Sequence, residues 1–319
     1  MENIKYNVVG GVYATMVTPY KNGEIDYKVA EKLVDWYWKQ GCDGIFAACA
    51  SSEIAFLSLD ERVRLTRTVV RRAKELAEND KSRAPLAIVA SGHVSCSFEE
   101  QVRELCAIAA EGPDALILIS NRMDIGNTTE DKWIEETQRL VDSLPSDIPL
   151  GIYESPIPYK RLLTEKMIKW CADSGRFYFI KDTSCDAAII KKRVELCEGS
   201  NLKIFNANAQ TLLESVKDGA FGYCGVMANV HPSVYSKLLK SEDLNSELCD
   251  KIQAYITLST IVETLTYPCS AKYYLDKYEG ISMSTYSRSA NEQKLTDYQK
   301  SCIDQFALIE AIAKKELGI

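Results

Sequence analysis

The sequence predicts a (β/α)8 barrel, the α/β architecture of TIM-barrel type, followed by a helical C-terminal extension. Short apolar runs alternate with amphipathic segments up to about residue 225, and there are eight such runs. Strands that alternate with helices form parallel sheets, and eight units close a barrel rather than a doubly wound sheet. From about Pro232 the strand-like runs stop. The chain has 319 residues, which suits a barrel of about 250 residues with an addition.

Each apolar run has the length and composition of a buried strand. The runs are Val12–Val17, Gly44–Ala48, Leu86–Ala90, Ala115–Ile119, Leu150–Tyr153, Phe177–Ile180, Lys203–Phe205 and Ala220–Cys224. Between the second and third runs, apolar residues at helical spacing predict a helix over Asp60–Ala77. Ser58 and Glu61 have the spacing of a capping box at its start.

The last part of the chain reads as helices only. They are predicted over Val234–Leu239, Leu248–Leu265, Cys269–Tyr278 and Leu295–Leu317. No linker rich in proline, glycine or serine separates this part from the barrel. We therefore assign residues 1–231 to the barrel and residues 232–319 to a C-terminal helical extension.

The composition is that of a globular protein with a sizeable core, with 26% charged and 46% hydrophobic residues. The net charge is −7 and no basic patch is visible, which argues against nucleic acid as a partner. It does not exclude an anionic small molecule, because a local pocket can reverse the overall field. No stretch approaches 18 unbroken apolar residues, so no membrane span is predicted.

The eleven cysteines are scattered singly, and there are only two histidines. This pattern predicts reduced thiols in a cytoplasmic protein rather than a disulfide framework or a zinc site. The opening MENIKYNVVGG lacks the basic-then-apolar layout of a secretory signal. No glycine-rich nucleotide fingerprint and no metal cluster is present, so no cofactor and no metal are expected.

Lys181 is the strongest candidate for a chemical role. It follows the apolar run Phe177–Ile180, so it lies at the end of a predicted buried strand, where the active sites of such barrels are found. Poor solvation there should lower the pKa of the amine. An uncharged lysine is the nucleophile that forms a Schiff base with a carbonyl compound. The alternative is a lysine that merely caps the strand and reaches solvent.

Tyr153 ends the preceding strand, one βαβ repeat before Lys181 in the chain. The two side chains should therefore lie at the same height on adjacent strands about 4.8 Å apart. A phenol beside an imine-forming lysine can carry protons while the imine forms and while a C–C bond is made or broken. The alternative is a tyrosine that packs on the barrel rim.

At this point the chain resembles the dihydrodipicolinate synthase / N-acetylneuraminate lyase family, the class I aldolases of the TIM-barrel type. The blocks that carry the resemblance, in their order and spacing, are GVYATMVTPYKNGEID, GCDGIFAACASSEIAFLSLDER, GIYESP, FIKDTSCD, DGAFGYCGVMANVHP and PCSAKYYLDKYEG. The resemblance implies that Lys181 is the Schiff-base lysine and Tyr153 the catalytic tyrosine.

The same resemblance implies substrate-binding residues. Ser51 matches a hydroxyl residue that helps hold the keto-acid carboxylate, and Ser52 and Glu53 of the same motif are assigned to the substrate with it. Cys224 matches a position whose backbone carbonyl faces the site. Thr183 is also assigned to the substrate, although the residues after Lys181 could equally cap the next helix. In that helix, Lys191-Lys192-Arg193 reads as a solvated face.

Several family features are missing. Ala50 replaces a hydroxyl residue of the synthases' proton relay, and both glycines of the second-strand motif are replaced. Met123 stands near the place of the relay tyrosine that a neighbouring subunit supplies. Pro158 stands where the synthases have an arginine. Tyr159, Lys160 or Arg161 could supply a replacement contact.

We therefore expect a lyase or aldolase that binds pyruvate or a related 2-oxo acid as an imine on Lys181, with a 2-oxo acid or aldehyde as substrate. The alternative is a non-catalytic, ligand-binding or regulatory barrel, and a true 4-hydroxy-tetrahydrodipicolinate synthase is expected less. The family also implies a homo-oligomer, a dimer or a homotetramer. Met123 and Ile125 are expected to be exposed on a loop at the barrel mouth, which would suit an interface.

Overall fold

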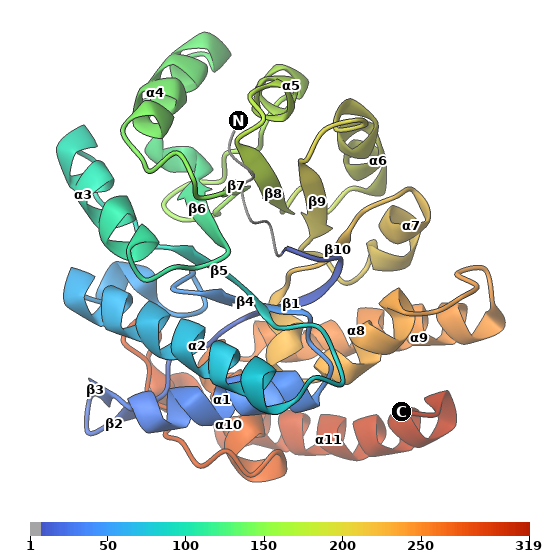
Figure 1. Ribbon diagram of the computed structural model, residues 1–319. Coiled ribbons are helices and arrows are strands. Elements are labelled where there is room, and N and C mark those ends of the chain that lie inside the picture. The colour runs from blue at the N-terminus through green and yellow to red at the C-terminus, as the bar shows by residue number, and fades with distance from the viewer. Residues whose placement is uncertain (1–7) are drawn as a thin grey trace.

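The computed structural model describes residues 8–319, which form a closed barrel of eight parallel strands surrounded by helices (Figure 1). This confirms the predicted (β/α)8 fold class. In pairing order the strands are β1 (Gly11–Thr15), β4 (Gly44–Ala47), β5 (Ala87–Ser91), β6 (Ala115–Ile119), β7 (Leu150–Tyr153), β8 (Phe177–Asp182), β9 (Lys203–Asn206) and β10 (Gly222–Tyr223). Each overlaps one predicted apolar run. The expected lack of a signal sequence rests largely on residues 1–7, which lie outside the described part of the chain.

One helix follows each barrel strand. These helices are α1 (Tyr27–Lys39), α2 (Leu59–Asn79), α3 (Phe98–Ala109), α4 (Glu130–Asp142), α5 (Glu165–Asp173), α6 (Ala187–Leu196), α7 (Leu212–Lys217) and α8 (Pro232–Leu239). A hairpin of β2 (Tyr20–Lys21) and β3 (Glu24–Ile25) follows β1, and three 3₁₀ turns follow β4, β6 and β10: η1 (Ile54–Phe56), η2 (Ser120–Arg122) and η3 (Val226–Asn229).

The predicted capping box begins α2. The Ser58 hydroxyl accepts from the Glu61 amide at 3.2 Å, and the Glu61 carboxylate accepts from the Ser58 amide at 2.8 Å. Both bonds satisfy amides that a helix start would leave unpaired. Together they fix the point at which the chain turns away from the second-strand loop, which belongs to the candidate site.

The barrel interior is filled by aromatic rings. Tyr13, Phe179 and Phe205 are fully buried there. The rings of Phe179 and Phe205 stack with centroids 4.2 Å apart, and Tyr13 meets Phe205 edge-on at 4.8 Å. Because side chains along a strand alternate between faces, Lys181 points to the same side of β8 as Phe179. The Lys181 side chain and these aromatic rings therefore both face the interior of the barrel.

The extension consists of helices, as predicted, but α8 belongs to the barrel. The extension elements are α9 (Glu247–Ser259), η4 (Thr260–Thr264), α10 (Cys269–Tyr278), η5 (Glu292–Lys294) and α11 (Asp297–Leu317). Helix α8 packs on β1 as the eighth barrel helix, so the barrel helices continue to Leu239, beyond the predicted division at residues 231 and 232. Figure 1 shows α10 and α11 beneath α1, and Trp36 of α1 donates to the Glu279 carboxylate at 2.7 Å. Within residues 8–319 no helix is long and apolar enough to cross a membrane.

Candidate active site

Lys181 and Tyr153 lie side by side at the carboxyl ends of adjacent strands. The residues are direct partners in the register of β7 and β8, which confirms the predicted equal height. Strand β8 extends through Asp182, so Lys181 lies inside the strand rather than after it. Lys181 is 5% exposed and Tyr153 is 4% exposed. The Lys181 Nζ lies 4.5 Å from the centroid of the Tyr153 ring and 5.8 Å from that of Phe46.

The pKa of Lys181 is raised, and the sequence argument that burial would lower it was therefore incomplete. Burial does lower the pKa, but the groups that point at the amine outweigh it, with Tyr153 first, then Cys224, Cys49 and Glu263. The Lys181 amine makes no hydrogen bond or ion pair with any residue in the described range. An imine forms from the uncharged amine.

The pKa of the Tyr153 phenol is also raised, because burial disfavours the phenolate more than the nearby Lys181 ammonium favours it. The phenol is therefore protonated near neutral pH and can act as a proton donor. Burial raises the pKa of the Cys224 thiol to about 12, against the opposing charge of Lys181. The Cys224 thiol is therefore protonated near neutral pH.

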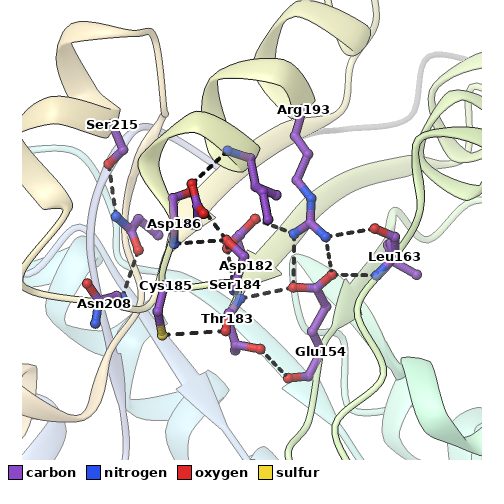
Figure 2. A network of polar contacts seen from close by, with 12 residues as sticks. Glu154, Leu163, Asp182, Thr183, Ser184, Cys185, Asp186, Arg193, Asn208 and Ser215 are labelled. Atoms are coloured by element: carbon purple, nitrogen blue, oxygen red, sulfur yellow. Dashed lines mark hydrogen bonds and ion pairs between the residues drawn. The ribbon is translucent and has the colours of Figure 1, made fainter.

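Behind the two residues, a buried ionic network fixes the ends of β7 and β8 (Figure 2). Glu154 and Asp182 follow Tyr153 and Lys181, so they point to the helix side of the sheet. Arg193 of α6 binds both carboxylates, with 2.8 Å to Glu154 Oε1 and a short contact to Asp182 Oδ2. All three side chains are at most 4% exposed. Arg193 is therefore not part of a solvated face, since α6 turns it toward the sheet.

The same network takes up Thr183. The Thr183 amide donates to Glu154 Oε2 at 2.9 Å, and its hydroxyl donates to the Glu154 carbonyl at 2.8 Å. Thr183 thus ties the end of β8 to the end of β7, and its assignment to the substrate stays a prediction. The cap of α6 comes from Asp186, whose carboxylate accepts from the amides of the first helical turn.

The loop after β4 offers hydrogen-bond donors at the barrel mouth. The Ser51 hydroxyl lies 3.1 Å from Thr15 Oγ1. The amides of Ala50 and Ser51 have no acceptor among residues 8–319. Ser52, in contrast, is fully buried and donates to the Met16 carbonyl at 2.7 Å. Its hydroxyl holds the loop against Met16, the residue that follows β1, and its predicted contact with the substrate stays a prediction.

Glu53 turns away from the site, which corrects its assignment to the substrate. Its carboxylate binds Lys272 Nζ at 2.9 Å, the Ser287 hydroxyl at 2.8 Å and the Arg288 and Ser289 amides at 2.6 and 2.9 Å. The Glu53 backbone has φ 65°, in the left-handed region that a residue with a Cβ adopts only at a cost. These bonds hold that conformation and link the second-strand loop to the extension.

Two side chains that the sequence argument missed belong to the extension. Glu263 of η4 is half-buried and acts electrostatically on Lys181. The Tyr267 hydroxyl accepts from Asn229 Nδ2 at 3.2 Å, and Asn229 Nδ2 also donates to the Thr15 carbonyl at 2.7 Å. Both were missed because they follow no strand. The signals available were a carboxylate within the apolar run Ile261–Leu265 and an aromatic residue before Pro268.

No group of three or more histidine, cysteine or carboxylate side chains in residues 8–319 could hold a metal ion. His93 is fully buried, and its ring nitrogens lie 3.0 Å from Gln101 Oε1 and 2.6 Å from the Ile119 amide. Both nitrogens are thereby used within the fold. The chemistry that remains for the site is that of an amine, a phenol, a carboxyl group and unpaired backbone donors.

A family model described as the dihydrodipicolinate synthetase family matches residues 8–78. Two curated proteins named 4-hydroxy-tetrahydrodipicolinate synthase match much more of the chain. The one from Thermodesulfovibrio yellowstonii is 24% identical over 231 residues, which are 72% of this chain and 74% of that protein. The one from Jannaschia sp. is 25% identical over 257 residues, 81% of this chain and 78% of that protein. The chain is thus similar to proteins of this family over most of its length, at low sequence identity.

Solved structures of the dihydrodipicolinate synthase family share the whole fold. The 4-hydroxy-tetrahydrodipicolinate synthase from Methylacidiphilum fumariolicum has a TM-score of 0.81 at 18% identity and covers 98% of this chain and 99% of its own. The sialic acid aldolase of Ruminococcus gnavus has a TM-score of 0.80 at 18% identity, with coverage of 97% and 99%. The protein thus has the fold of the family's aldolases and lyases.

The loop after β6 departs from the pattern that the resemblance implies. Met123 is 2% exposed and packs in the core, so its predicted exposure was wrong, whereas Ile125 is 43% exposed. Arg161 binds Asp124 Oδ2 at 2.9 Å and the Met123 carbonyl at 3.2 Å. The Tyr159 hydroxyl donates to the Ile125 carbonyl at 3.1 Å. Arg161 and Tyr159 therefore hold this loop rather than replace the missing arginine contact.

Proposed function

We propose that the protein is a class I aldolase or lyase that binds pyruvate or a related 2-oxo acid as an imine on Lys181. One observation carries this proposal. Lys181 is a buried amine without a hydrogen-bond partner in the described range, at the carboxyl end of a barrel strand and against the ring of Tyr153. A buried charge is normally paired. A lysine that is left unpaired in this position is available to react.

The loop after β4 supplies a place for the carboxylate of the 2-oxo acid. The free amides of Ala50 and Ser51 and the Ser51 hydroxyl are donors, and backbone amides of a turn form a concave anion site. Cys224 lines the amine from the β10 side. These groups are held in place by three further side chains whose polar atoms form hydrogen bonds within the protein: Ser52, Thr183 and Glu53.

In the proposed reaction, the Lys181 amine attacks the keto carbon, and water leaves as the imine forms. Tyr153 donates and accepts protons in these steps and during the making or breaking of the C–C bond. The ionic network of Arg193 holds β7 and β8 in register, so that phenol and amine keep their mutual geometry. A solved relative is consistent with pyruvate as the ligand. This prophage protein from Escherichia coli, of the dihydrodipicolinic acid synthase family, was solved in complex with pyruvate and has a TM-score of 0.80 at 19% identity.

Borohydride reduction in the presence of pyruvate tests the proposal. Borohydride converts an imine into a stable secondary amine, so the intact mass should increase by one reduced pyruvate unit and the modified peptide should contain Lys181. Incubation with borohydride alone is the control. An unchanged mass would instead favour the non-catalytic ligand-binding barrel, and a modified lysine elsewhere would contradict the assignment.

We propose an activity other than that of the synthases for which the curated relatives are named. Ala50 lacks the relay hydroxyl, Met123 is buried in the core, and Pro158 cannot hold a carboxylate as arginine does. We expect little condensation of pyruvate with aspartate semialdehyde. A kcat/KM above about 10⁴ M⁻¹s⁻¹, in the ordinary range of enzymes, would show that this chain is a true synthase.

For the assembly we propose a homo-oligomer in which each chain holds a complete site. One solved relative is described as the first monomeric dihydrodipicolinate synthase variant, with a TM-score of 0.78 at 18% identity. The residues that act on Lys181 in this chain, Tyr153, Cys224, Cys49 and Glu263, are the groups that the proposal requires to lie within one subunit. Light scattering at micromolar concentration should give a mass above the 35.7 kDa of one chain. A mass equal to one chain would reject the oligomer.

A further inference from the structure

The turn after β4, which carries the free amides of Ala50 and Ser51, is closed by Glu53. The Ser52 amide donates to the Cys49 carbonyl at 3.0 Å. The Glu53 amide donates to the Ala50 carbonyl at 2.9 Å, and Glu53 itself takes the left-handed conformation with φ 65°. A helical turn that ends in this way leaves its first amides without internal acceptors. The availability of these two donors therefore depends on the conformation of Glu53.

Nothing within the turn favours that conformation. A side chain disfavours the left-handed region because its Cβ lies too close to the following carbonyl oxygen. Glycine adopts the same φ without this penalty, but residues 49–53 include no glycine. A conformation of this kind persists only when the surrounding structure holds it. The contacts of the Glu53 side chain must therefore supply what the turn itself does not.

Those contacts come from two segments of the extension. One Glu53 carboxylate oxygen accepts from Lys272 Nζ of α10 at 2.9 Å. The other accepts from three donors between α10 and η5: the Ser287 hydroxyl at 2.8 Å, the Arg288 amide at 2.6 Å and the Ser289 amide at 2.9 Å. Glu53 is 2% exposed and Lys272 is fully buried, so water does not compete for these bonds. Hydrogen bonds to a charged group are stronger than those between neutral groups.

The side chain of Arg288 holds the chain beyond the turn as well. Its guanidinium donates to the Phe56 carbonyl at 3.1 Å and pairs with Glu61 at 2.8 Å, at the start of α2. It also donates to the Gly23 carbonyl of the hairpin that follows β1, at 3.1 Å. The extension thus binds the loop after β4 both at Glu53 and on its way to α2.

We propose that Glu53 is a positioning residue for the carboxylate of the substrate, and that the extension thereby makes the site selective for carbonyl compounds that carry a carboxylate. This rests on the proposed imine function. Glu53 does not touch the substrate. It holds the turn in which the Ala50 and Ser51 amides remain free to bind an anion, and Lys272 with residues 287–289 holds Glu53.

The proposal separates recognition of the carboxylate from reaction at the carbonyl group. Lys181 and Tyr153 lie on β8 and β7, and neither is bonded to the turn after β4. A carbonyl compound without a carboxylate therefore reacts at Lys181 without help from the turn. A fault in the turn should weaken the reaction with a 2-oxo acid and spare the reaction with its neutral ester.

The test compares borohydride trapping with pyruvate and with methyl pyruvate, its methyl ester, in the full-length protein. The ratio of the two trapping efficiencies measures recognition of the carboxylate, because a loss of folded protein lowers both alike. Glu53→Ala/Lys272→Met severs the contact and leaves no buried charge unpaired. Its ratio of pyruvate to methyl pyruvate should fall about tenfold or more, as expected when a hydrogen bond to a charged group is lost.

A milder variant and a matched control accompany the double variant. Ser287→Ala removes a single donor to Glu53 and covers the case in which the double variant does not fold. Its ratio should fall about two- to threefold, the effect of one weakened hydrogen bond. Trp36→Phe removes a different bond between barrel and extension, the one from α1 to Glu279 at 2.7 Å, and should keep the native ratio.

Hydrogen exchange of the peptide that contains residues 49–53 examines the turn without any imine. The bonded amides of Ser52 and Glu53 should exchange faster in the Glu53→Ala/Lys272→Met and Ser287→Ala variants than in the native protein, because their turn opens more often. Added pyruvate should slow exchange of this peptide in the native protein and have less effect in the variants.

The possible results separate this proposal from the imine function. A lower ratio together with faster exchange supports the positioning role of Glu53. An unchanged ratio, unchanged exchange, or an equal fall of the ratio in Trp36→Phe would overturn it. If the native protein is trapped by neither compound but pyruvate still slows its exchange, and does so less in the variants, the imine function is rejected and the positioning role stands. If pyruvate neither traps the native protein nor slows its exchange, both proposals fail.

Discussion

Two lysines are buried in this protein in closely similar surroundings, yet only one is available for chemistry. Lys181 Nζ lies 4.5 Å from the centroid of the Tyr153 ring, and Lys272 Nζ lies 4.6 Å from that of Tyr20. Lys272 is fully buried and donates to Glu53 at 2.9 Å and to the Tyr286 carbonyl at 2.7 Å. Lys181 has neither kind of partner in the described range. The difference lies in the acceptors, not in the depth of burial.

The pKa values of the two amines are shifted in opposite directions, but the direction alone does not identify the reactive lysine. Burial lowers the pKa of Lys272 despite the opposing charge of Glu53, whereas the groups around Lys181 raise its pKa. A rule that looked only for a lowered pKa would select the structural lysine. The informative property is that Lys181 faces groups that can exchange protons with it, while the bonds of Lys272 join the barrel to the extension.

The largest expected effect is the loss of the adduct in Lys181→Arg. Arginine stays charged and cannot form an imine, so borohydride trapping with pyruvate should be abolished. Lys272→Arg is the matched variant and should retain trapping in whatever fraction is folded. Intact mass measures both. Undiminished trapping by Lys181→Arg would show that another amine is the nucleophile.

The next largest effect concerns the tyrosine ring beside each amine, Tyr153 for Lys181 and Tyr20 for Lys272. Tyr153→Phe keeps the ring but removes the phenol proton, and turnover on a confirmed substrate should fall by about 10²–10⁴. Tyr20→Phe keeps the contact with Lys272 and should leave turnover nearly unchanged. Steady-state kinetics distinguish the two. A native rate in Tyr153→Phe would mean that another group, such as Glu263, carries the proton alone.

For stability, in contrast to adduct formation, we expect a large effect at Lys272. Lys272→Met leaves the buried Glu53 carboxylate without its cation, which should lower the free energy of unfolding by about 3–5 kcal/mol. Urea unfolding measures this as a lower midpoint at an unchanged slope. The double variant Glu53→Gln/Lys272→Met removes both charges and should recover part of the loss. A single variant as stable as the native protein would show that the pair does not hold the extension.

The smallest effect is a pH dependence that originates at Glu263. Its pKa is about 7 in the fold against an ordinary 4.5, so the folded protein binds this proton more tightly than the unfolded chain. The resulting stability is fully present below pH 4.5 and is lost as the pH rises through 7, by roughly 3 kcal/mol at most. The difference between native protein and Glu263→Gln in urea unfolding should follow this curve. A difference that is constant with pH would contradict the shifted pKa.

The sequence by itself determined the barrel fold and the pairing of Tyr153 with Lys181 at the carboxyl ends of adjacent strands. Eight apolar runs predicted eight strands because a strand that is buried on both faces appears in the sequence as a short continuous apolar run. The one-repeat spacing of Tyr153 and Lys181 predicted their register because parallel strands joined by helices keep a common height. The inference of the barrel needed only residues that are near each other in the chain. The inference of the pair needed only two residues at equivalent positions on successive strands.

Only the tertiary structure decided how the surrounding charges are used. Arg193 looked like part of a solvated run, but α6 turns it toward two buried carboxylates. Glu53 looked like a substrate ligand, but its partner Lys272 lies more than two hundred residues away and is reached only when the extension folds back. Glu263 was missed because it lies in the extension and does not end a barrel strand, so its position in the chain gave no reason to place it near the site. Electrostatic partners depend on distance in space, and local sequence patterns do not encode that distance.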